Sequence, residues 1–425
     1  MCAVDPRADP VADRHPWRAA IVLGLATIAL GMAYTILIMP AITHTRGWWV
    51  VGEVWPPLLG ARFVANGALG YLYSADPFFV AGPIGAMALV PVVIVGDTLH
   101  LTDNYRYLVP HPTMWLVYGP YALGFGMALL YAARALAHQV WVEEGLAARG
   151  IAPRYLWTQA TMVGLVLMPA AVVYGHFEDV LALALVLLGI RSMFSGRFGA
   201  AAMWFGLAIG TKQWALLGLP ILVAATPATT RLRTLARSLV IPAALMAFTL
   251  SVDWSHASVG LFRPRAFPQL GHAALWVSRS GGEIVGPPER WGAILTAIGL
   301  AYWLRDRREP RLLLAGFALA YLSRVLFEPV VFAYYLVPAL ALMFLHERGA
   351  GRTGLRTTVG GGAIMLFFLL HPNPWLWWAV TAAGIGWVAS PAARDVLGRG
   401  ELPVEPGGER SMAVEPVADL THVST

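Results

Sequence analysis

Long blocks of apolar residues, separated by short polar stretches, constrain this chain more than any other feature. The blocks run for about 15 to 25 residues, which suits helices that cross a hydrocarbon layer of about 30 Å. Only 13% of the residues are charged, whereas soluble domains carry about 25%. The pattern predicts an all-α, polytopic transmembrane bundle of about 12 to 13 helices. The blocks are 19–39, 78–95, 114–137, 156–174, 180–190, 198–225, 235–252, 291–304, 312–327, 330–345, 359–370 and 375–390.

Arginine-rich loops between the blocks predict the orientation, because basic loops stay on the cytoplasmic side. They occur in 7–18, 231–237, 305–311 and 346–356. Residues 1–18 are then a cytoplasmic tail, 19–391 form the transmembrane domain, and the polar segment 392–425 is a disordered cytoplasmic tail. The two longest loops, 40–77 and 253–290, face outward. The middle stays open: either 78–95 is re-entrant and 198–225 is a hairpin, or 198–225 crosses once.

The net charge of +6 does not indicate a nucleic-acid partner, because the arginines lie in these topological loops. Membrane lipids are the expected surroundings. The single cysteine, Cys2, excludes an intramolecular disulfide. The sequence contains no metal-ligand cluster, phosphate-binding loop or dinucleotide fingerprint that stands out, so neither a metal nor a cofactor is expected.

Lys212 is the only lysine, and it lies inside the apolar block 198–225. A charge near the middle of a bilayer costs at least about 2.5 to 3.5 kcal/mol on insertion scales. One interpretation is a lysine that reaches a lipid headgroup from a helix end. The other is an ammonium in a break between two helices, where it binds phosphate.

Further costly polar residues fall in three places. Glu53 lies among tryptophans, where desolvation would suit a general base, although a simple pair with Arg62 or Arg46 also fits. His176, Glu178 and Asp179 open a helix, and capping explains Asp179 best. Arg324 and Glu328 are four residues apart and can form a structural ion pair. Tyr334 and Tyr335 follow and can offer hydroxyls to a sugar or phosphate.

Several of these segments resemble one family. The stretches 52–55, 60–67, 72–78 and 82–83 resemble the first outer loop of GT-C membrane glycosyltransferases, above all glycosyltransferase family 87. Segments 175–179, 206–220 and 328–338 look similar too. Two positions depart from the family pattern: Glu53 stands where an aspartate is usual, and Gly82 precedes Pro83 where two prolines are usual.

The resemblance implies a GT-C-like fold with a large first outer loop and a polyprenyl-phosphate-mannose-dependent mannosyltransferase of actinobacteria. It implies a glycolipid or cell-envelope glycan as acceptor, transfer with inversion, and a bacterial plasma-membrane enzyme whose active site faces the extracytoplasmic side. Glu53 would be the catalytic base. Lys212, Arg62, Arg324, Tyr334 and Tyr335 would bind the donor phosphate and sugar. His176, Glu178, Asp179 and Glu328 would be supporting polar residues. The alternatives are a transporter or flippase of a lipid-linked glycan, and an inactive GT-C-like scaffold.

Overall fold

The structure is a computed structural model, which describes residues 55–74, 81–100, 114–143, 162, 176–262, 265–266, 272–273, 284–285, 290–328, 330–369 and 374–398. Helices dominate these residues, so the predicted all-α class is confirmed. The α-helices are α3 (Trp55–Ala65), α4 (Pro83–Thr98), α5 (Met114–Glu143), α8 (Phe177–Phe194), α9 (Phe198–Thr211), α10 (Leu219–Ala225), α11 (Arg231–Val252), α12 (Trp254–Phe262), α13 (Arg290–Leu304), α14 (Pro310–Phe327), α15 (Val337–Gly349), α16 (Leu355–Leu369) and α17 (Pro374–Val396).

Short 3-10 helices and strands complete the described part. The 3-10 helices are η3 (Leu69–Ser74), η6 (Gln213–Gly218), η7 (Ala228–Thr230) and η8 (Ala333–Leu336). The strands are two residues long and pair antiparallel: β1 (Arg265–Ala266) with β3 (Ile284–Val285), and β2 (His272–Ala273) with β4 (Val330–Val331). The predicted outer segment 253–290 thus contains a helix and short strands.

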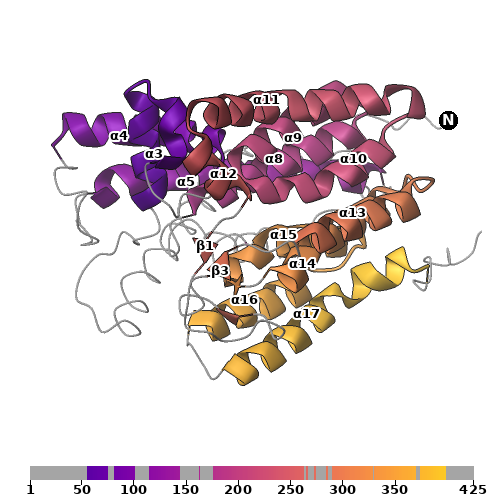
Figure 1. Cartoon of the computed structure of the whole chain (residues 1–425). Coiled ribbons are helices and arrows are strands. Elements are labelled where there is room, and N and C mark those ends of the chain that lie inside the picture. Colours follow the sequence, from indigo (N-terminus) through magenta and orange to yellow (C-terminus); the bar gives the residue numbers. More distant parts are fainter. Residues whose placement is uncertain are drawn as a thin grey trace, which may run out of the picture.

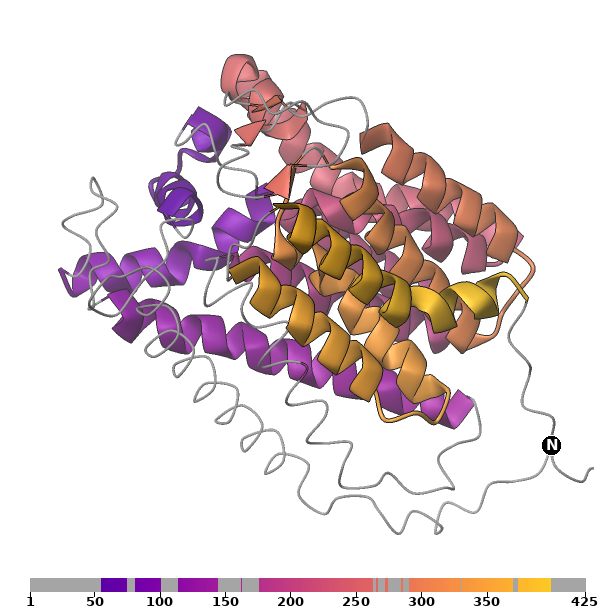
Figure 2. The ribbon, with the colours of Figure 1, turned by 90° about the horizontal axis from the view of Figure 1, so that it is seen from below.

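The helices pack in two layers. In Figure 1, α8, α9, α10 and α11 lie above α13, α14, α15, α16 and α17. Within the upper layer α8 packs on α9 and α5, and α9 packs on α11; in the lower layer α14 packs on α13, α15 and α17. α10 and η6 join the layers through α13 and α14. In the view of Figure 2 the helices α14 to α17 lie side by side.

Two described segments are apolar and long enough to cross a membrane: Ala228–Val252, with mean hydropathy 1.8, and Pro310–Phe327, with 1.4. α11 exposes large apolar side chains, among them Leu232, Val240 and Phe248. A wide exposed apolar face of this kind marks contact with lipid or a partner. The number and the direction of the membrane crossings stay predictions.

The block 198–225 is a hairpin broken at Lys212. α9 ends at Thr211 because Lys212 takes an extended conformation, with φ −150° and ψ 127°. The chain then returns through η6 and α10. The start of α9 lies near Arg237 of α11, and the carbonyl after α10, on Thr226, accepts a hydrogen bond from Arg231 at 3.1 Å. Both ends of the block therefore lie at the same side, beside the beginning of α11.

α4 begins against the turn of this hairpin. The backbone N–H of Gly82 donates to the carbonyl of Thr211 at 2.8 Å, and Pro83 opens the helix. α3 and α4 lie together at this end of the bundle (Figure 1). The structure thus shows 198–225 as a hairpin, and the re-entrant path of 78–95 stays a prediction.

Two element boundaries differ from the sequence prediction. The block 330–345 begins with β4 and η8, so its helix starts only at Val337. α17 runs on to Val396, so residues 392–396 are helical rather than part of a disordered tail, and Asp395 pairs with Arg311 and His346. These side-chain contacts between α14, α15 and α17 keep the last turn ordered. The predicted first helix and the block 156–174 lie, apart from residue 162, outside the described residues.

Candidate functional site

Three segments that are far apart in sequence meet at the end of the bundle where the hairpin turns. They are the start of α8 at 176–179, the break at 212–214, and the end of α14 with η8 at 324–335. η6 packs on both α8 and α14, which brings the three together. We call the polar residues of these segments the Lys212 cluster: His176, Glu178, Asp179, Lys212, Trp214, Arg324, Glu328, Tyr334 and Tyr335.

Lys212 is buried and paired with two carboxylates. Its Nζ lies 2.7 Å from Oε1 of Glu178 and 3.4 Å from Oδ2 of Asp179. The side chains are 5%, 0% and 1% exposed, so none of the three charges is directed to solvent. A buried charge is tolerated only with partners of this kind, since desolvation of an ion costs several kcal/mol. The ammonium therefore stays inside the protein and does not reach for a headgroup.

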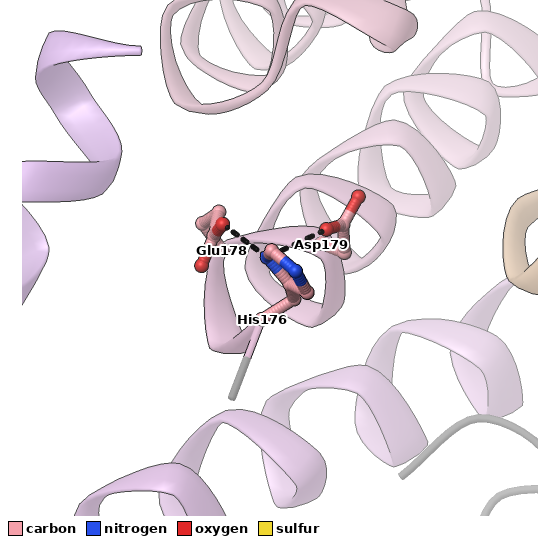
Figure 3. Close-up of side chains that lie close together, drawn as sticks. All are labelled: His176, Glu178 and Asp179. Atoms are coloured by element: carbon pink, nitrogen blue, oxygen red, sulfur yellow. Dashed lines mark hydrogen bonds and ion pairs between the residues drawn. The ribbon is translucent and has the colours of Figure 1, made fainter. Parts of the chain in front are cut away.

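His176 precedes α8 and contacts both carboxylates of its first turn. Its Nδ1 lies 2.9 Å from Oε1 of Glu178 and 3.9 Å from Oδ2 of Asp179, as Figure 3 shows. The other oxygen of Asp179 accepts a hydrogen bond from the indole N–H of Trp214 at 2.5 Å. Because α8 begins at Phe177, the two acidic side chains also lie at the positive end of its dipole.

The end of α14 adds a cation and an aromatic group. The Nε–H of Arg324 donates to Oε1 of Glu328 at 3.2 Å, one helical turn away. The guanidinium lies 3.7 Å from the ring centre of Tyr335. Tyr334 packs on Tyr335 with ring centres 4.9 Å apart, and on His176 at 4.3 Å. Tyr334 thus connects the Arg324 pair with the carboxylates around Lys212.

Not every predicted donor-binding residue lies in this cluster. Arg62 of α3 pairs with Asp97 at 2.5 Å. Asp97 lies near the far end of α4, about 22 Å along the helix from Gly82, which contacts the hairpin turn. Arg62 is therefore remote from Lys212. Glu53, the predicted base, and Arg46 lie outside the described residues.

Trp214 and Gly82 take part in the site although sequence reasoning gave them no role there. The signal for Trp214 was an indole N–H in an apolar block two residues after the lysine, where it needs an acceptor. For Gly82 the signal was the departure from the family's two prolines. A Cβ at Gly82 would lie 2.1 Å from the carbonyl oxygen of Gly210. A proline there would also lack the N–H that binds Thr211.

Among the described residues, His176, Glu178 and Asp179 are the group that could hold a metal ion, because one ligand atom of each lies within 4.8 Å of the others. The arrangement thus offers carboxylates, an imidazole and two cations in a buried setting. Such a setting strengthens electrostatic interactions with a bound anion or with a developing charge.

No family model matches the chain, and no curated protein matches it significantly. Among solved structures the chain is similar to ArnT from Cupriavidus metallidurans in the apo state. The identity is 15% and the TM-score 0.43, over 90% of this chain and 78% of that chain.

Proposed function

We propose that this chain is a membrane glycosyltransferase that moves a sugar, mannose in the expected case, from a polyprenyl phosphate to a glycolipid or glycan acceptor. The enzyme would lie in a bacterial plasma membrane with its site toward the extracytoplasmic face. Two features support this assignment: the apolar helices, and the charged and aromatic residues gathered at one end of them. A lipid-linked sugar has the matching chemistry, with an apolar tail, a phosphate and a polar ring.

The position and hydrogen bonding of Arg324 support the proposal most directly. Its hydrogen bond to Glu328 uses only Nε, and its side chain is 14% exposed. In the proposed complex its terminal amino groups donate to a phosphate that approaches from the exposed side. A guanidinium fork suits phosphate oxygens well because it donates two parallel N–H bonds.

Lys212 would act on the same phosphate through its charge. Its hydrogen bond goes to Glu178, so a direct contact with a donor would require the ammonium to move. Tyr334 and Tyr335 border Arg324 and would pack against the sugar or donate to its hydroxyls. Arg62, which the sequence predicted to bind the donor, lies apart from the Lys212 cluster. It would instead stabilise the outer loop through its pair with Asp97.

The proposed reaction needs one base and a stabilised leaving group. The acceptor hydroxyl gives its proton to the carboxylate of Glu53 while its oxygen bonds to the anomeric carbon. The bond from that carbon to the phosphate oxygen breaks with inversion. The electron pair stays on the polyprenyl phosphate, whose charge Arg324 and Lys212 stabilise. No step requires a metal ion or a cofactor.

Glu53→Gln tests the proposed base. The amide is similar in size and cannot accept the proton, and general-base catalysis contributes typically about 10²- to 10⁴-fold. We expect sugar transfer to fall by that factor while binding of the lipid donor persists. Glu53→Asp is the matched control, since it restores the residue usual in the resembled family and keeps the charge. Transfer by Glu53→Gln at the wild-type rate would remove Glu53 from this role.

The helix break at Lys212 also fits a second candidate, a transporter or flippase for a lipid-linked glycan. Discontinuous helices with charged residues at the break occur in such proteins. The two candidates differ in product: a transporter moves the donor intact, whereas a transferase cleaves it. Proteoliposomes with radiolabelled donor, analysed for both location and integrity of the lipid, separate them.

A further inference from the structure

His176, Glu178 and Asp179 have the spacing of ligands around a metal ion. Nδ1 of His176 lies 2.9 Å from Oε1 of Glu178 and 3.9 Å from Oδ2 of Asp179 (Figure 3). Zinc binds nitrogen and oxygen ligands at about 2.0 to 2.2 Å, which places neighbouring ligands about 3 to 4 Å apart. One imidazole and two carboxylates form a donor set that several divalent ions accept.

The ammonium of Lys212 lies at this same group. Its Nζ is 2.7 Å from Oε1 of Glu178 and 3.4 Å from Oδ2 of Asp179, the two oxygens that face His176. Lys212 reaches them from another element, the break between α9 and η6. A cation therefore already contacts two of the three ligand atoms.

A neighbouring side chain orients one of these carboxylates, as hydrogen-bond partners orient the ligands in metal sites. The indole N–H of Trp214 binds Oδ1 of Asp179, so the other oxygen faces the cation. That oxygen and Oε2 of Glu178 are buried and have no hydrogen-bond partner among the described residues. Both carboxylates thus keep electron pairs that a multivalent ion could use and that one ammonium does not saturate.

We propose that His176, Glu178 and Asp179 form a divalent-cation site whose built-in occupant is the ammonium of Lys212. In the intact protein the ammonium excludes the ion by charge and by volume. Without it, two buried carboxylates remain uncompensated, which favours uptake of a cation. If the proposed function holds, Lys212 supplies the fixed positive charge that a metal would supply beside the donor phosphate.

Lys212→Ala tests this inference, with Mn²⁺ as the probe and bound ion counted by electron paramagnetic resonance on purified, chelator-treated protein. We expect about one tightly bound Mn²⁺ in the variant and none at this site in the wild type. Lys212→Ala combined with Glu178→Gln is the matched control. It lacks one ligand and should bind at least about tenfold more weakly, since even outer partners of a metal site are worth about 10- to 100-fold.

Lys212→Gln is the control for a folding defect. Its side chain fills most of the volume of the lysine and keeps a hydrogen-bond donor for Glu178, while it removes the charge. It should bind Mn²⁺ more tightly than the wild type and less tightly than Lys212→Ala. Binding by neither single variant, or equal binding by the wild type, overturns the proposal. So does binding that survives Glu178→Gln unchanged.

The transfer assay gives a second readout. Mn²⁺ should restore part of the activity that Lys212→Ala loses, and should not restore the double variant. If the Lys212 variants bind Mn²⁺ but the wild type transfers no sugar, the result counts against the proposed function and still supports the cation site. Transfer by the wild type with no binding in either Lys212 variant would do the reverse.

Discussion

Nζ of Lys212 lies 2.7 Å from Oε1 of Glu178, although the two residues are 34 positions apart and both side chains are buried. This pair joins the break between α9 and η6 to the first turn of α8. It fixes the turn of the hairpin at one end of the bundle, where Gly82 and the beginning of α4 also dock. The geometry of the candidate site depends on this contact.

Removal of one partner of this pair should be strongly destabilising. Glu178→Gln leaves a buried ammonium with weaker compensation, and loss of one partner of a buried pair costs about 3 to 5 kcal/mol. Glu178→Gln with Lys212→Met should recover much of that loss, because no charge is then left unpaired. Thermal unfolding of Glu178→Gln, Lys212→Met and the double variant in detergent measures the coupling. Simple additivity of the two single changes would contradict it.

A side chain at Gly82 should disrupt the dock between α4 and the hairpin turn. Its Cβ would meet the carbonyl of Gly210 at 2.1 Å, so the backbone would have to move. We expect Gly82→Ala to destabilise by about 1 to 3 kcal/mol, the usual cost of overpacking. Gly124→Ala in α5 is the control, since nothing lies within 4 Å of a Cβ there. Equal melting temperatures for the two variants would show that the close approach is not required.

Arg324→Lys should weaken donor binding while leaving the fold intact. Lysine keeps the charge but loses the fork and the stacking on Tyr335. We expect KM for the lipid donor to rise by about 10-fold, the equivalent of about 1.4 kcal/mol. Arg305→Lys is a matched control: Arg305 lies 3.9 Å from the ring centre of Tyr302 and 3.2 Å from Asp306, outside the Lys212 cluster. A similar KM for both variants would remove Arg324 from donor binding.

Asp253 should make the start of α12 sensitive to acid. Burial raises the pKa of Asp253, but hydrogen bonds from His256 and Ser255 lower it by more than burial raises it. The net pKa therefore lies below the usual value. A carboxyl with a depressed pKa stabilises the fold above its unfolded pKa of about 3.9 and loses that contribution as the pH falls below it.

We therefore expect Asp253→Ala to cost about 1 kcal/mol at neutral pH, as for a lost N-cap, and progressively less toward pH 3. Melting temperatures of both proteins between pH 3 and pH 7 provide the measurement. A difference that stays constant down to pH 3 would mean that the ionised carboxylate is not responsible.

Much of the architecture could be predicted from the sequence. The apolar blocks predicted most described helices, because long runs without charges suit helices that bury their backbone in an apolar phase. Boundaries failed where tertiary contacts decide them. Residues 330–336 form a strand and a 3-10 turn, and 392–396 stay helical because Asp395 pairs with Arg311 and His346.

The candidate site was only partly predictable. Lys212, Glu178 and Arg324 stood out because each charge is costly in an apolar setting. That Lys212 pairs with Glu178 and Asp179 could not be foreseen, since it depends on the packing of α8 against α9 and η6. For the same reason the separation of Arg62 from the cluster appears only in three dimensions.

The most direct test of the proposed activity is transfer by the purified wild-type chain in proteoliposomes. The donor is a polyprenyl phosphate that carries radiolabelled mannose, and the acceptor is a membrane glycolipid extract. The proposal predicts that label moves to the acceptor while an equal amount of free polyprenyl phosphate appears. Intact donor that crosses the bilayer with its label still attached, and no labelled acceptor, would contradict it.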